Sequence, residues 1–86
     1  MKKVLTSSSV RRIIENNYKA EVSSAVLQGD YIIINCATAE KNFPFIALRL
    51  LNYFPQLRMV HFTGGWVEGV YTRETLRYAG YKVKHV

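Results

Sequence analysis

The stretch from Phe43 to Phe54 places the strongest constraint on the fold, because it is the longest apolar stretch in the chain. Pro44 falls in the first turn, where a helix tolerates proline, and Pro55 ends the stretch. The pattern therefore predicts a helix over 43–54, with Asn42 as its cap. This helix would be the centre of the only core that an 86-residue chain has room to build.

Two polar positions interrupt the predicted central helix. Arg49 and Asn52 are three residues apart, so they define one narrow stripe that faces water. All other positions are apolar, and we expect the helix to be buried around most of its circumference. The predicted core residues are Ile33, Leu48, Leu51 and Phe54.

A β-hairpin is predicted before this helix. Val22–Leu27 and Tyr31–Cys36 are rich in Val and Ile and are joined by Gln28-Gly29-Asp30, which offers a glycine for the turn. The second run is nearly continuous in apolar residues, as in strands covered on both faces. We expect it inside the sheet, with Cys36 buried and chemically inert.

The N-terminal third begins with a predicted helix. Val10, Ile13, Ile14 and Tyr18 recur at helical spacing after the serine run 7–9, which offers an N-cap. The helix should end near residue 17, and residues 1–6 are expected to be a frayed terminus.

The C-terminal third predicts three further elements. Leu57–Thr63 is a strand, and Gly64-Gly65 offers a two-residue turn into a returning strand over 66–71, the alternative being one loop over 64–70. Thr72 caps a helix that runs to Ala79 and stops at Gly80. Tyr81–Val86 alternates in polarity and predicts a final strand.

Together these elements predict a single α+β domain over residues 1–86. Two or three helices pack on a mostly antiparallel sheet of four or five strands, in the order helix, strand, strand, helix, strand, (strand), helix, strand. A single cysteine excludes an internal disulfide and favours a reducing, cytoplasmic setting, which includes a virus- or plasmid-encoded protein acting there. Serines follow Met1-Lys2-Lys3 where a signal peptide would be apolar, and no stretch is long enough to span a bilayer.

Charge gives the main functional indication. The net charge is +6, and residues 20–40 contain three carboxylates but no Lys or Arg, so the cations concentrate in the two ends of the chain. Such an excess favours anionic partners, and we expect a small non-enzymatic, regulatory module that binds nucleic acid. The predicted contact residues are Arg11, Arg12, Arg73, Arg77, Lys82 and Lys84, with Tyr81 stacking on a base.

A protein-interaction module, of the inhibitor or adaptor type, is the alternative. Trp66 follows paired glycines at an expected hairpin tip, where it would anchor a protein partner or cover the edge of the core. The glycine-rich segment 63–69 lacks the lysine of a phosphate-binding loop. The predicted terminal strand offers an edge for a homodimer, although Lys82 and Lys84 oppose such pairing.

A small toxin-type ribonuclease is the weaker alternative. His61 or His85, with Glu68 and Arg73, would supply the acid, the base and the cation that such an enzyme needs. Their spacing carries no recognisable catalytic motif, and Cys36 with two scattered histidines has no metal-ligand spacing. We therefore predict no catalytic residue, no metal and no cofactor.

Overall fold

A computed structural model describes residues 4–18, 20–64 and 68–84. Within these residues the elements are α1 (Ser7–Tyr18), β1 (Glu21–Gln28), β2 (Tyr31–Ala37), the 3₁₀ turn η1 (Glu40–Asn42), α2 (Phe43–Tyr53), β3 (Met59–Thr63), β4 (Gly69–Thr72) and α3 (Arg73–Tyr78). The strands form one sheet in the order β1-β2-β3-β4. The α+β class is confirmed. The sheet is mixed, because β2 and β3 pair in parallel while both outer pairs are antiparallel.

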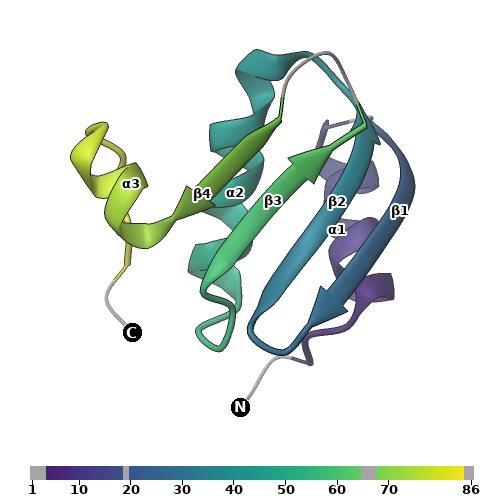
Figure 1. The fold of residues 1–86 in the computed structure, drawn as a ribbon, viewed down its shortest axis with the longest axis horizontal. Helices are drawn as coiled ribbons and strands as arrows, with labels where there is room; N and C mark the ends of the chain where they lie inside the picture. The colour runs from purple at the N-terminus through teal and green to yellow at the C-terminus, as the bar shows by residue number, and fades with distance from the viewer. Residues whose placement is uncertain (1–3, 19, 65–67, 85–86) are drawn as a thin grey trace.

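The two long helices lie on the same face of the sheet. Figure 1 shows α1 and α2 behind the strands and α3 beyond the β4 edge, so no helix or strand of the described residues covers the face toward the viewer. Burial alternates accordingly along the central strands, where Ile32, Ile34, Val60 and Phe62 are fully buried against the helices. The core therefore lies between the sheet and the helices.

Only one side of α2 is buried, which corrects the prediction of a helix covered around most of its circumference. Leu51 and Phe54 are fully buried, as predicted, but Leu48 is only partly buried. Phe45 is 51% exposed and Tyr53 41% exposed. The sheet covers one side of the helix, whereas among the described residues only the short C-terminal segment lies along the outer side.

The expected burial of β2 on both faces is also wrong. The strand lies inside the sheet, between β1 and β3, as predicted. Ile33, however, points to the uncovered face and is only partly buried. Cys36 points to the core and is 8% exposed, and its burial raises the pKa of the thiol above the ordinary value. The predicted hairpin with β1 is confirmed, with Gln28 opposite Tyr31 across the turn.

Threonine, not serine, caps α1. The Thr6 hydroxyl accepts a hydrogen bond from the Ser9 backbone N–H at 3.0 Å, and the Ser9 hydroxyl accepts one from the Thr6 N–H at 3.0 Å. This reciprocal pair satisfies two backbone donors at the helix start. Thr6 therefore forms the entrance to α1, and residues 1–3 lie outside the described residues.

The second hairpin forms, but not through the predicted turn. β3 and β4 are antiparallel with Phe62 opposite Gly69, so the connection runs over residues 64–68 rather than through Gly64-Gly65 alone. Gly64 has φ +87°, and a Cβ there would lie 2.2 Å from the Asn35 amide oxygen. Both the positive φ angle and the close approach of Asn35 thus require glycine at position 64. Trp66 lies outside the described residues.

The α3 helix starts and ends as the sequence predicts. Thr72 and Thr75 form a capping box, and Gly80, at φ +97°, ends the helix. The Gly80 N–H donates to the Arg77 carbonyl and the Tyr81 N–H to the Leu76 carbonyl, which is a Schellman motif. Beyond it, residues 81–84 form no strand, so that prediction is wrong. None of the helices in the described ranges is long and apolar enough to cross a membrane.

Candidate nucleic-acid interface

Arg73, predicted to contact phosphates, is a structural residue. It is 6% exposed, and its guanidinium donates hydrogen bonds to the Leu51 carbonyl at 2.7 Å and the Phe54 carbonyl at 3.1 Å, with a further bond to the Leu57 carbonyl. These carbonyls lie at and beyond the C-terminus of α2, where helix carbonyls lack partners. Burial is the main cause that lowers the Arg73 pKa from its ordinary value. The side chain is unavailable to a phosphate.

The other predicted C-terminal cations do gather. The Asn52 side-chain amide takes the place of a neighbouring strand: its oxygen accepts from the Lys84 N–H at 2.9 Å, and its nitrogen donates to the Lys82 carbonyl at 3.3 Å. Arg77 reaches the Lys84 carbonyl at 3.4 Å. The C-terminal segment is therefore held along α2, and it brings Arg77, Lys82 and Lys84 together in exposed positions.

A pocket lies beside this segment, on the outer side of α2. Its volume is about 380 Å³. It is lined by side chains from α1, α2 and the C-terminal segment: Tyr18, Phe45, Leu48, Arg49, Asn52, Tyr53 and Lys84. Aromatic rings and cations thus share one concave site.

Arg49 and Tyr18 hold one wall of this pocket. The Arg49 Nε donates to the Tyr18 hydroxyl at 3.0 Å, and that hydroxyl donates to the Phe45 carbonyl at 3.2 Å. The guanidinium carbon also lies 5.7 Å from the centre of the Tyr18 ring, within range of a cation–π contact. These contacts fix the guanidinium at its Nε and leave the two terminal nitrogens without hydrogen-bond partners among the described residues.

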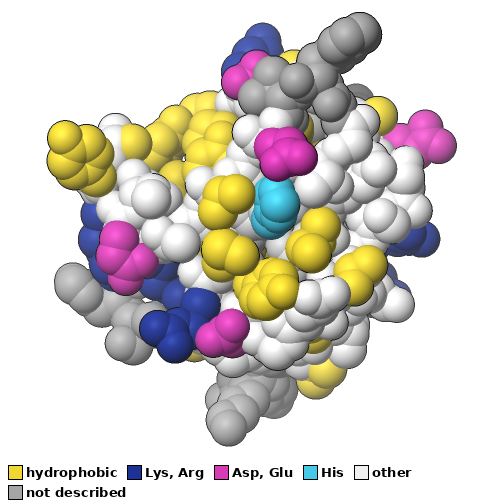
Figure 2. Space-filling view, viewed as in Figure 1, with side chains coloured by type: hydrophobic (Ala, Val, Ile, Leu, Met, Phe, Trp, Pro, Cys, Tyr) yellow, Lys and Arg dark blue, Asp and Glu magenta, His cyan; other side chains and the backbone are white. Residues whose placement is uncertain are grey.

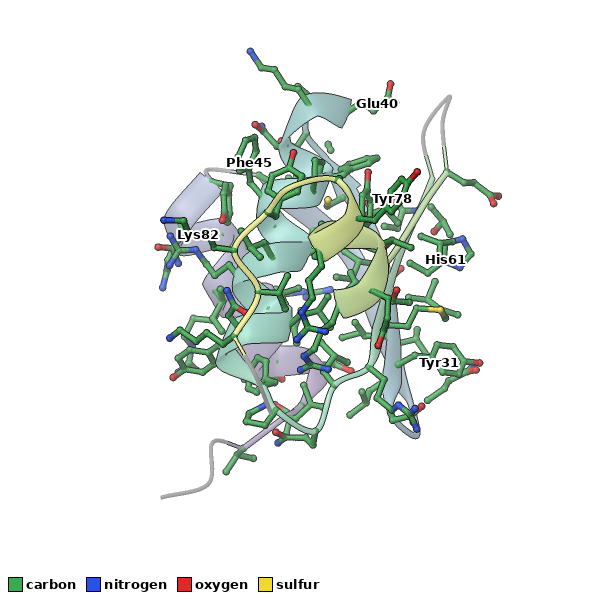
Figure 3. All side chains as sticks on the ribbon, turned by 90° about the vertical axis from the view of Figure 1, so that its left-hand side faces the viewer. Tyr31, Glu40, Phe45, His61, Tyr78 and Lys82 are labelled. Atoms are coloured by element: carbon green, nitrogen blue, oxygen red, sulfur yellow. The ribbon has the colours of Figure 1, made fainter. Side chains whose placement is uncertain are left out.

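We call Arg49, Arg77, Lys82 and Lys84, with the rings of Tyr18, Phe45 and Tyr53, the basic–aromatic surface. Figure 3 shows Phe45 and Lys82 on this side of the molecule, while Tyr31 and His61 project from the opposite side of the sheet. The ion pairs between described side chains are Arg58–Asp30 and His61–Glu68, so none of the four cations has a carboxylate partner there. Their charge is available to an anionic ligand.

The remaining predicted contact residues lie elsewhere or play a different role. Tyr81 is half-buried and packs edge-on against Phe45, with ring centres 5.6 Å apart. Arg11 donates to the Ser23 carbonyl, at the bulge of β1, and Arg12 is exposed on α1 outside the pocket. Trp66, Lys2, Lys3 and His85 lie outside the described residues.

Arg49 and its two flanking rings were missed as site residues. The spacing of Arg49 and Asn52 indicated only a solvent-facing stripe. Phe45, Arg49 and Tyr53 follow one another at intervals of four, so they line one side of a helix. A stripe that alternates aromatic and basic side chains is the signal that would have identified this surface.

The opposite side of the molecule has a different character, and we call it the open sheet face. Strand pairing arranges its side chains in rows across the sheet. The middle row consists of Val26, Ile33, His61 and Val70. Val26 is 47% and Val70 52% exposed, and Figure 2 shows hydrophobic side chains on both sides of the histidine.

Two residues of the predicted ribonuclease site, His61 and Glu68, lie together on this face. The His61 Nε2 lies 3.5 Å from a Glu68 carboxylate oxygen. Arg73 does not join them, because its guanidinium is buried at the end of α2. No group of three or more His, Cys, Asp or Glu side chains within the described ranges is placed to hold a metal ion. Without Arg73, the predicted set of acid, base and cation is not assembled at this pair.

No family model, curated protein or solved structure matches this chain. Its function must therefore be argued from the surfaces themselves.

Proposed function

We propose that this chain is a small non-enzymatic module that binds single-stranded nucleic acid on its basic–aromatic surface. The observation that carries the proposal is the pocket in which exposed aromatic rings lie next to Arg49 and Lys84. Proteins that bind single strands combine cations that follow the phosphates with rings on which bases stack. This surface supplies both within one site.

The geometry favours an unpaired strand over a duplex. Phe45 and Tyr53 flank Arg49 along α2, and each ring is at least two-fifths exposed. A base in a duplex is already stacked on its neighbours, whereas a base in a single strand offers a free ring face. The adjacent cations, Arg77, Lys82 and Lys84, would then contact phosphates along the strand.

The test is a matched pair of arginine substitutions, Arg49→Ala and Arg58→Ala. Both side chains are exposed and both changes remove one positive charge, but Arg58 pairs with Asp30 away from the surface. Oligonucleotide affinity is measured by fluorescence anisotropy over a range of salt concentrations. We expect Arg49→Ala to reduce the salt slope by about 0.7, the value for one phosphate contact on a single strand. Adding Lys84→Ala should reduce it by about 1.4 in all.

Two outcomes would reject this function. Equal losses from Arg49→Ala and Arg58→Ala would show that only the net charge attracts nucleic acid. A wild-type protein that binds neither single strands nor duplexes at low salt would remove nucleic acid as the ligand.

A second candidate function is that of a protein-interaction module, and the open sheet face favours it. This face presents aliphatic side chains without Lys or Arg among its rows. Exposed apolar patches mark interaction sites on small proteins. Binding through this face would change little with salt, which distinguishes it from phosphate-driven binding.

A further inference from the structure

We infer that a second copy of this chain packs on the open sheet face, so that two sheets lie face to face about a two-fold axis. This inference is independent of the proposed nucleic-acid function, because it concerns the opposite side of the molecule. It rests on the pairing of the strands, on the composition of the face and on where the cations lie.

Strand pairing indicates that the face is incomplete as it stands. β2 and β3 pair in parallel, and sheets built only of parallel strands are covered on both faces. Here no other element of the described chain lies over these two strands on the open side, and Ile33 and Met59 are only partly buried. A second copy packed on this side would cover the centre of the sheet.

The middle row fits a copy of itself. Val26, Ile33, His61 and Val70 run straight across the four strands. A two-fold axis between the sheets, whether along this row or along the strands, places the row of one copy over the row of the other. Val26 and Val70 then meet their own copies or each other, while His61 meets His61 or Ile33 of the second copy, in an arrangement like that of a β-sandwich.

The charge distribution also favours a second copy on this face. Two chains that each carry +6 repel one another, and they can approach most closely where neither presents cations. The rows of the open sheet face contain no Lys or Arg, whereas the basic–aromatic surface lies on the helical side. Face-to-face packing thus directs both sets of cations outward.

Pairing through the edge of the sheet is less suited to the dimer. β1 is the long edge strand, and a bulge between Val22 and Ser24 interrupts its register. The Arg11 guanidinium donates a hydrogen bond to the Ser23 carbonyl at this bulge. A bulge and a charged side chain both oppose the addition of another strand.

The test measures the mass in solution by analytical ultracentrifugation from micromolar to near-millimolar concentration. We expect the wild type to reach twice the chain mass of 9.9 kDa. Val70→Lys should raise the dimer dissociation constant at least about tenfold, because it buries an unpaired ammonium group in the interface. Val70 is already 52% exposed, so the monomer should fold normally. Val4→Lys adds the same charge at a residue that is 73% exposed and lies before α1, and it should leave the dimer intact.

Cysteine pairs then define the axis. Val26→Cys alone should cross-link two copies if the axis runs along the row, and Val26→Cys mixed with Val70→Cys should cross-link if it runs along the strands. A wild type that stays at the mass of one chain overturns the inference. A dimer that Val70→Lys and Val4→Lys weaken equally, or not at all, overturns it too.

Discussion

The two sides of this sheet are built from the same strands but differ in how far their side chains are buried. On the helical side, Ile32, Ile34, Val60 and Phe62 are fully buried under α1 and α2. On the open side, their sequence neighbours Ile33 and His61 are only partly buried, and Val26 and Val70 are about half exposed. Apolar composition alone therefore does not distinguish a core strand face from a surface face. The helical layer determines which strand face is buried, and the helices of the described residues cover only one side of the sheet.

The cations follow the opposite distribution. The basic–aromatic surface lies on the outside of the helical layer, and the rows of the open sheet face contain neither Lys nor Arg. The fold thus separates a polar, charged surface from an apolar one by the thickness of one helix and one sheet. The surface proposed to bind nucleic acid and the face proposed to bind a second copy therefore do not overlap.

The largest expected effect compares two adjacent residues of β2. Ile34→Ala removes a fully buried side chain on the helical side and should lower the free energy of unfolding by roughly 2–5 kcal/mol. Ile33→Ala changes the same residue type on the open side and should cost much less in the monomer. Denaturant titration at low protein concentration, where the monomer dominates, measures both. Equal losses would mean that the open face is buried within the monomer.

A second comparison concerns the two arginines of α3. Arg73→Ala should lower the free energy of unfolding by roughly 2–4 kcal/mol, because buried carbonyls that lose a partner cost about 1–3 kcal/mol each. Arg77→Ala, one turn later and exposed, should change it by no more than about 0.5 kcal/mol. Urea unfolding followed by circular dichroism checks both values. If Arg73→Ala left the free energy of unfolding unchanged, Arg73 would again be a candidate for phosphate contact.

A third comparison tests which side carries the nucleic-acid site. Phe45→Ala should weaken single-strand binding by roughly 1–3 kcal/mol, the loss of one base stack, and should leave duplex binding nearly unchanged. Val70→Ala, at a similarly exposed apolar residue on the open side, should leave both affinities unchanged. Anisotropy titrations with one strand and its duplex make the measurement. If Val70→Ala caused the larger loss, the site would belong on the open face.

The smallest effect is an alkaline loss of stability that arises on the helical side. Burial raises the pKa of Cys36 above its ordinary 9.0, and burial, then Glu40 and Tyr81, raise that of Tyr71. Both groups stay protonated in the native state while the unfolded chain loses the protons. Their stabilisation is therefore complete below the unfolded pKa values and is lost as the pH rises through the native ones.

Urea midpoints measured at neutral pH and above pH 9.0 test this expectation. Cys36→Ala should reduce the alkaline decrease, since it removes one of the two groups. An unchanged pH dependence in this variant would show that the thiol titrates alike in both states.

Local patterns in the sequence predicted the elements that depend on neighbouring residues. The first hairpin, the α2 helix and the Thr72 cap of α3 all follow from spacing, turn residues or capping side chains. The parallel pairing of β2 with β3 depends on where α2 crosses the sheet, and periodicity does not encode this. The same limit explains why Ile33 was wrongly predicted to be a core residue. A continuous apolar run looks alike whether one face or both faces of the strand are covered.

The site was predictable only in part, for a related reason. Charge and position identified Arg77, Lys82 and Lys84 as a group, and the structure brings them together. Sequence periodicity predicted that Arg73 would share their exposed face, but the carbonyls that Arg73 satisfies come from residues 16 to 22 positions earlier. Contacts over such separations decide whether a cation is free to bind a ligand, and no local pattern reports them.

The way in which Asn52 holds the C-terminal segment has a consequence for motion. The backbone of residues 82–84 is hydrogen-bonded through one amide side chain and the Arg77 contact, not through a strand ladder, and Val83 packs against the core. Such a segment opens with a free energy well below that of global unfolding, and its amide hydrogens should exchange early. When it opens, Lys84 leaves the lining of the pocket. Occupancy of the pocket and closure of the segment are therefore linked equilibria, and a bound ligand would slow exchange at the Lys84 amide in proportion to its affinity.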